Sequence, residues 1–393
     1  MIRKLSADFI FPSTSLPIKN GILVVDEEQK ILDVAEAGKY AADEIEMFSG
    51  ILCPGFVNAH CHLELSFMKN QLPEKTGLVG FIRNLLALRA KEHTNIFSAI
   101  DDADDEMFHS GIVAVGDISN ATDSFARKSK SKIYYQTFVE CFGFVEEKAA
   151  DNFSISEKVF DEATKLNLAA SIVPHAPYSV PPALMKKIFS FEKNNPFVFS
   201  FHNQETQAED DYFRKGTGEF VELLKHFDLL KHQMQVSGKS SLQSVLDFFP
   251  SEKNLLLVHN TTTSQEDFDF ANSFHKNLWW CTCPNANLFI ENRLPDYNVL
   301  LQKPERLCIG TDSLASNHQL SVLEELKTIS KNRNDISLEI LLRAATINGA
   351  EFLQIENRFG SFDVGKTPGI NLIKNIDSEK IQLTAESVVQ KVL

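Results

Sequence analysis

Two histidines, His60 and His62, stand two positions apart at the end of the apolar run ILCPGFVNAH. On an extended backbone, side chains i and i+2 point to the same face, so both imidazoles can reach one cation while Cys61 points away. A third histidine and a carboxylate would complete a nitrogen and oxygen ligand set suited to zinc or iron. A lone H-x-H is weak evidence, because two polar residues in a loop give the same pattern.

Further polar residues end later apolar runs of the chain. In chain order they are His175, His202 with Glu205 three residues on, His259 and Asp312. The carboxyl ends of barrel strands meet at one mouth, where active sites are built. With His202 and Asp312 added, the first histidine pair becomes strong evidence for a metal site. Four other histidines fall in helix or loop patterns, and we predict them on the surface: His93, His226, His232 and His275.

Two competing metal motifs are weaker. The letters HLE at 62–64 match the H-x-E of cytidine deaminases, but that motif also needs P-C-x-x-C, and CTCPNAN lacks the spacing. Cys281 and Cys283 could be thiolate ligands, yet no second cysteine pair stands at finger spacing. A packed seventh strand is therefore the favoured interpretation of these two cysteines.

The elements that must position the polar residues are short apolar runs alternating with helical patterns. Eight such runs occur, each followed by room for a helix, as GLVGFIRNLLALRAKEH from Gly77 illustrates. Continuous apolar strands indicate a parallel sheet covered on both faces. We predict an α/β fold, a (β/α)8 TIM-type barrel over residues 53–355, with a doubly wound open sheet as the alternative. Another helical pattern, SLEILLRAATINGAEFL, ends this region.

The two chain ends have a different texture. GILVVD and KILDV near the start, and GSFDVGKTPGINLI and KIQLTAESVV near the end, resemble short strands joined by turns. We predict that residues 1–52 and 356–393 together form a small composite β domain.

Composition narrows the function classes. Hydrophobic residues make up 43% and charged residues 23% of the 393 residues, which predicts a sizeable core. The formal charge of −14 disfavours nucleic acid or an anionic membrane as partner. No window is long and apolar enough for a membrane span or a signal peptide, and the six cysteines show no disulfide framework. A cytoplasmic protein is the expectation.

Several motifs in order along the chain resemble the amidohydrolase superfamily, in the branch of nucleoside deaminases and chlorohydrolases. They are PGFVNAHCHLE, PHAPYS, FHNQET, LLVHN, CPNANL, GTDSLASN and AATINGAEFL. The similarity extends from about residue 20 to residue 375. Within this branch, HCHLELS followed by GLVGFIRNLL most resembles the aminodeoxyfutalosine deaminases of menaquinone biosynthesis. Two segments, HNQET and GKTPGINLI, depart from the usual pattern of the family. The first places Asn203 and Gln204 beside Glu205, and the roles of these two residues stay open.

The resemblance implies roles for individual residues. One divalent metal, zinc by preference and iron as the alternative, is held by His60, His62, His202 and Asp312. Glu205 shuttles protons, His259 stabilises the tetrahedral intermediate, and Asp312 passes a proton to the departing ammonia. No lysine ends the fourth strand run, which argues against a carbamylated two-metal site. Contacts with substrate are expected from His175, Glu64, Ser316 and Asn317, although Glu64 could equally lie in a solvated loop.

The activity implied is hydrolytic deamination of an aminated purine nucleoside, with water attacking the ring carbon and ammonia leaving. Aminodeoxyfutalosine is the specific expectation. The enzymatic alternatives are S-adenosylhomocysteine or methylthioadenosine deamination, guanine deamination and triazine dechlorination. An alternative of another class is a catalytically dead binding protein, which the retained set of six site residues argues against. The partner is then a small molecule, and members of this branch are often homodimers.

Overall fold

The computed structural model describes residues 2–193 and 198–393. In this part of the chain, eight buried strands lie within the apolar runs from which the sequence predicts them. They are β8 (Phe56–Cys61), β9 (Ile112–Ser119), β10 (Tyr134–Cys141), β11 (Ala169–Pro174), β12 (Val198–Asn203), β13 (Asn254–His259), β14 (Leu278–Thr282) and β15 (Leu307–Ile309). The polar residues described above lie at or just after the carboxyl ends of five of these strands: β8, β11, β12, β13 and β15.

The eight strands form two parallel sheets of four. Their orders are β11-β10-β9-β8 and β12-β13-β14-β15. Backbone hydrogen bonds also connect the edges of the two sheets. The N–H of His202 donates to the carbonyl of His175 at 2.9 Å, and the N–H groups of Thr311 and Asp312 both donate to the carbonyl of His60 at 3.1 Å. The architecture is therefore α/β with parallel strands, as predicted.

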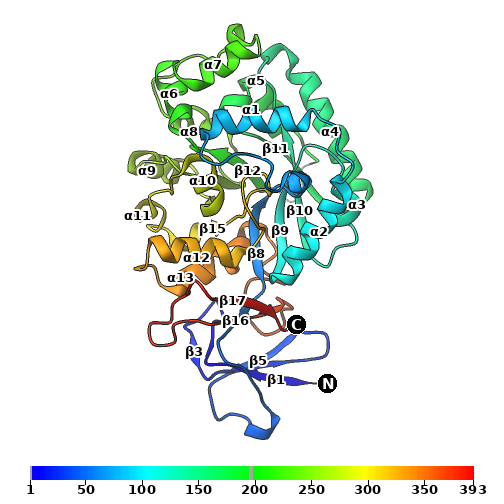
Figure 1. Cartoon of the computed structure of the whole chain (residues 1–393), viewed down its shortest axis with the longest axis vertical. Coiled ribbons are helices and arrows are strands. Elements are labelled where there is room, and N and C mark those ends of the chain that lie inside the picture. Colours follow the sequence, from blue (N-terminus) through cyan, green and yellow to red (C-terminus); the bar gives the residue numbers. More distant parts are fainter. Residues whose placement is uncertain (1, 194–197) are drawn as a thin grey trace.

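Helices lie around the outside of these strands (Figure 1). They are α1 (Gly77–Arg89), α2 (Ile96–His109), α3 (Phe125–Lys128), α4 (Ala149–Lys165), α5 (Pro182–Phe189), α6 (Gln207–Lys215), α7 (Glu219–His226), α8 (Ser241–Val245), α9 (Gln265–Phe274), α10 (Pro284–Glu291), α11 (Tyr297–Leu300), α12 (Val322–Asn332), α13 (Leu338–Ala344) and α14 (Ile347–Phe352). The pattern predicted as one helix from Ser337 is divided into α13 and α14. A 3-10 helix, Leu63–Met68, follows β8 directly.

Two further sheets are drawn at the bottom of Figure 1, one from the N-terminal part of the chain alone and one from both chain ends. Their strand orders are β5-β4-β1-β6 and β17-β16-β7-β2-β3. The strands are β1 (Arg3–Ser6), β2 (Phe9–Ile10), β3 (Ile18–Lys19), β4 (Ile22–Val25), β5 (Ile31–Ala35), β6 (Glu46–Met47), β7 (Ile51–Pro54), β16 (Ile370–Lys374) and β17 (Val388–Lys391). Apolar residues from both ends, among them Leu5, Ile31 and Phe362, pack into one cluster between them.

The run ILCPGFVNAH contains two strands, where the sequence predicts one. β7 pairs antiparallel with β16, whereas β8 begins the first parallel sheet. Gly55 lies between them, and a Cβ there would come within 2.3 Å of Val113 and 2.7 Å of the Pro368 carbonyl. The chain passes between the terminal sheets and the parallel sheets at a point where only glycine fits, and the predicted boundary at 52/53 falls inside β7.

Buried thiols and one buried histidine complete the core. All six cysteines are buried and free of disulfides. His275, which the sequence predicts at the surface, is only 2% exposed, and its Nε2 lies 3.1 Å from the Pro250 carbonyl. Over residues 2–193 and 198–393, no helix has the length and apolar character needed to traverse a bilayer.

Candidate active site

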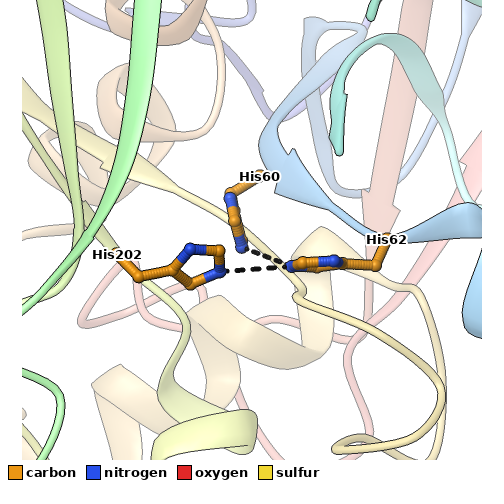
Figure 2. Close-up of side chains that lie close together, drawn as sticks. All are labelled: His60, His62 and His202. Atoms are coloured by element: carbon orange, nitrogen blue, oxygen red, sulfur yellow. Dashed lines mark hydrogen bonds between the residues drawn. The ribbon is translucent and has the colours of Figure 1, made fainter. Parts of the chain in front are cut away.

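Three imidazole nitrogens converge at the carboxyl ends of the parallel strands. The Nε2 atom of His62 lies 3.1 Å from Nε2 of His60 and 3.3 Å from Nε2 of His202 (Figure 2). The Oδ1 atom of Asp312 lies 3.3 Å from Nε2 of His62 and 3.6 Å from Nε2 of His60. These ligand atoms from distant parts of the chain therefore cluster in two groups that share His60: His60, His62 and His202, and His60, His259 and Asp312.

Local backbone structure aims these side chains. His60 belongs to β8 and His62 follows it, while Asp312 adopts a left-handed conformation with φ of 57° just after β15. A Cβ at Gly310 would come within 3.0 Å of the thiols of Cys281 and Cys283 and of the His60 side chain, so the approach to Asp312 requires glycine. The hydroxyl of Ser316 donates to Oδ2 of Asp312 at 2.5 Å, which leaves Oδ1 toward the histidines.

The protonation states suit a divalent cation. Burial lowers the pKa of His62 to about 3 and holds the pKa of His202 well below its ordinary value. Burial alone would raise the pKa of Asp312, but the surrounding imidazoles bring that pKa below its usual range. Neutral imidazoles and an ionised carboxylate are the forms that bind metal. His202 also donates through Nδ1 to the His175 carbonyl at 3.0 Å, which leaves a lone pair on Nε2.

Glu205 lies beside this set without a hydrogen bond to its carboxylate in the described part of the chain. Its backbone N–H and that of Gln204 donate to the carboxylate of Glu209 on α6, at 3.2 and 3.0 Å. This clasp fixes the turn after β12, where Gln204 has a φ of 45°. Burial, with the nearby negative charge of Asp312, raises the pKa of Glu205 well above its ordinary value. Such a carboxyl group can accept and return a proton near neutrality.

His259 faces Glu205 from the end of β13. Its Nε2 lies 3.7 Å from Oε1 of Glu205, and its Nδ1 lies 2.9 Å from Oδ1 of Asn287 on α10. Because the amide oxygen only accepts, Nδ1 carries the proton and Nε2 is free to face the site. His259 and Asn260 both have positive φ, 75° and 56°, a conformation that costs backbone strain in residues other than glycine.

These residues form the floor of a cavity of about 210 Å³. We use the name floor for the part of the cavity surface that is formed by His62, His202, Glu205, His259 and Asp312. His175 and Ser179 line the cavity beside it, with Nδ1 of His175 2.6 Å from the Ser179 hydroxyl. Apolar side chains also line the cavity, and we call the following set the wall: Leu78, Phe81, Ile82, Leu85 and Leu86 of α1, Leu223 of α7, and Phe227 just after it.

Three residues predicted to contact substrate do not line this cavity. Glu64 accepts from the backbone N–H groups of Asn120 and Ala121 at 2.9 and 3.0 Å and from Arg89 at 3.1 Å. The Asn317 side chain donates to Glu325 of α12 at 2.7 Å, and Ser316 donates to Asp312 as described. These geometries favour supporting roles for Glu64, Ser316 and Asn317 in place of the predicted contacts. His175 lies where a substrate contact was predicted.

Sequence reasoning missed other residues at the cavity. Glu140 ends β10 and lines the cavity, so the rule that polar residues at strand ends form the site would have found it. Asn287 lies in CPNANL, but its role as partner of His259 depends on α10 folding back over β13. Asn203 and Gln204, left open above, bond to neighbouring loops: Asn203 donates to Asn260 at 3.0 Å, and Gln204 donates to Asp267 at 2.9 Å.

Comparison with known proteins yields one family. The model of the amidohydrolase family matches residues 51–392. An adenosine deaminase of Helicobacter pylori is 27% identical over 88% of this chain and 85% of its own. An aminodeoxyfutalosine deaminase of Nitratiruptor is 26% identical over 91% of this chain and 87% of its own. The crystal structure of H. pylori aminofutalosine deaminase with methylthio-coformycin covers all of both chains, with a TM-score of 0.84 and 24% identity.

Proposed function

The chain belongs to the amidohydrolase family, a family of hydrolases whose relatives here act on carbon–nitrogen bonds, and we propose that it is a metal-dependent deaminase of aminated purine nucleosides. One observation carries the proposal. Ligand atoms of His60, His62, His202 and Asp312 lie 3.1 to 3.6 Å from one another along the set, near the buried carboxyl group of Glu205 that lines the cavity. The similarity to an adenosine deaminase and to an aminodeoxyfutalosine deaminase extends over nearly the whole chain. It supports an aminated purine nucleoside as the class of substrate.

The metal, zinc by preference, would be held by the three Nε2 atoms and Oδ1 of Asp312. When bound, such a cation lowers the pKa of a water from 15.7 toward about 7, so that a nucleophile is available near neutrality. The residues of the chain then manage protons and orientation. Glu205 accepts a proton from the attacking water and delivers it to the ring nitrogen of the substrate.

His259 and Asp312 act on the developing tetrahedral carbon. His259, fixed by Asn287 with its proton on Nδ1, presents the lone pair of Nε2, accepts from the hydroxyl group added to that carbon, and so orients and stabilises the tetrahedral intermediate. Asp312 accepts the remaining proton of the added hydroxyl group and passes it to the amino group, which leaves as ammonia as the carbon–nitrogen bond breaks and the ring carbonyl forms. His175 contacts the substrate from the side of the cavity. The wall excludes water from the reacting ring.

We also infer that the two parallel sheets close into one (β/α)8 barrel over residues 53–355. Hydrogen bonds between both pairs of sheet edges support this inference, as does the TM-score of 0.84 to a deaminase of the same family. Residues 1–52 and 356–393 form the small composite β domain, supported by the apolar cluster that both ends share.

Aminodeoxyfutalosine is the specific substrate that we propose, on the similarity to the Nitratiruptor and H. pylori enzymes. S-Adenosylhomocysteine and methylthioadenosine are the nearest alternatives. The test is ammonia release by the zinc-loaded full chain from aminodeoxyfutalosine, adenosine, methylthioadenosine, S-adenosylhomocysteine, guanine and a triazine. Release from none of the aminated nucleosides would refute the proposal, and faster release from another nucleoside would replace the specific substrate.

Removing the metal gives an independent check. Chelator-treated protein should lose turnover, and adding zinc or iron should restore it. Turnover that persists in protein shown by elemental analysis to be free of metal would contradict the metal-dependent mechanism.

A further inference from the structure

One buried carboxylate at the cavity has no part in the mechanism above. Glu140 lies at the end of β10, its side chain is 3% exposed, and it lines the cavity next to His175 and His202. Its Oε2 atom accepts from the side-chain amide of Asn120 at 2.8 Å. Its Oε1 atom is buried and has no hydrogen bond to any residue that the structure describes.

The nearest donor to Oε1 is already engaged. Nδ1 of His202 lies 3.4 Å from this oxygen, but its proton points to the His175 carbonyl at 3.0 Å. A buried acceptor that meets no donor is uncommon in folded proteins. A substrate that brings a donor to Oε1 would satisfy it.

The position of Glu140 determines which part of a substrate it can meet. His202 presents Nε2 to the candidate metal ligands and Nδ1 to Glu140, so the two groups lie on opposite edges of one ring. The reacting carbon must lie on the Nε2 side, within reach of Glu205. Glu140 therefore meets a part of the substrate away from the reacting carbon. In a purine nucleoside, that part is the sugar, whose hydroxyls are donors.

We propose that Glu140 binds a sugar hydroxyl of the nucleoside and thereby selects for hydroxylated sugars. The inference rests on the proposed function, because it takes the substrate to be a nucleoside. Asn120 acts as the partner that holds the Glu140 carboxylate in place through Oε2. Through this contact, Glu140 discriminates a nucleoside from an aminated heterocycle that carries no sugar.

The test compares two product nucleosides that carry no amino group to remove. Binding of inosine and of 2′,3′-dideoxyinosine to the zinc-loaded full chain is measured by calorimetry. We expect wild type to prefer inosine by about twofold to tenfold, the range for one ordinary hydrogen bond. The preference should shrink in Glu140→Gln and approach one in Glu140→Met, which has a similar shape and no oxygen. The matched control Glu162→Gln, an exposed carboxylate of α4, should keep the wild-type preference.

Because the result is a ratio within each variant, a smaller active fraction does not change it. No preference in wild type, or an unchanged preference in Glu140→Met, would overturn the proposal. So would equal weakening of both nucleosides together with loss of zinc, since that pattern indicates support of His202 only. Ammonia release without a hydroxyl preference would refute the role of Glu140 alone. A hydroxyl preference without ammonia release would refute the deaminase function alone.

Discussion

The floor and the wall of the cavity are built in different ways. Floor residues lie at strand ends and are fixed by partners, as His259 is by Asn287 and Asp312 by Ser316. Wall residues come from α1, α7 and the residue after α7, and they present apolar side chains without a directional bond. Backbone hydrogen bonds between the strands fix the positions of the side chains at the strand ends. A helix beside the cavity has no such bonds to the strands, so its sequence and tilt can vary. We therefore expect the floor to determine the reaction and the wall to determine how well a substrate binds.

The sharpest test of this division is Glu205→Gln. The amide cannot move protons, so kcat should fall by about 10²- to 10⁴-fold while zinc content stays the same. Steady-state ammonia release and elemental analysis measure the two quantities. Glu222→Gln, an exposed site on α7, is the control. Residual activity within tenfold of wild type would remove Glu205 from the role of proton shuttle.

Asp312→Ala should separate metal binding from the rest of the floor. Loss of a ligand should weaken zinc binding by more than the roughly 10–100-fold typical when only a supporting residue of a ligand is lost. Competition with a chelating dye gives the affinity. Unchanged zinc occupancy would exclude Asp312 from the ligand set. Ser316→Ala, which removes only the partner of Oδ2, should have a smaller effect.

Asn287→Ala tests whether partners matter to the floor. Without the acceptor on Nδ1, His259 can change tautomer and rotate, and we expect kcat to fall by about 10–100-fold with zinc retained. Asn287→Asp keeps an acceptor and should recover much of that loss. Equal activity of the Ala and Asp variants would show that Asn287 does not act through His259.

The smallest effect should come from the wall. Leu85→Asn places a polar group in the apolar side of the cavity, so KM should rise about tenfold, as expected for the loss of apolar burial, with kcat nearly constant. Ala87→Asn, on the same helix and outside the cavity, is the matched control. A large fall in kcat for Leu85→Asn would break the division between floor and wall.

The floor could be predicted from the sequence because two local rules suffice. Side chains two apart on a strand share a face, and parallel strands end at one edge, so His60, His62, His202 and Asp312 could be brought together without coordinates. The eight strands could be predicted because each lies in a continuous apolar run followed by a helical pattern. Glu140 obeys the second rule and was overlooked because it stands inside the apolar run IYYQTFVECFG.

The remaining features depend on contacts between distant elements. No local pattern says that α1 lies against the cavity, although its apolar residues cover more than one face. Ser316 and Asn317 follow Asp312 closely, yet their side chains turn back to Asp312 and to Glu325 of α12. Position in the sequence could not predict these side-chain partners, because they depend on tertiary structure. The division of ILCPGFVNAH likewise follows from the close approach of Val113 and Pro368 to Gly55.

The arrangement of the ligands across the two parallel sheets has a mechanical consequence. His60 and His62 extend from the first sheet, whereas His202 and Asp312 extend from the second. A cation held by all four would cross-link the two halves beside the backbone hydrogen bonds of His202 and of Thr311 and Asp312 that join the sheet edges. Its binding free energy would then add to the free energy of unfolding, because the unfolded chain has no such site. The ion that would activate water would then also hold the two parallel sheets together.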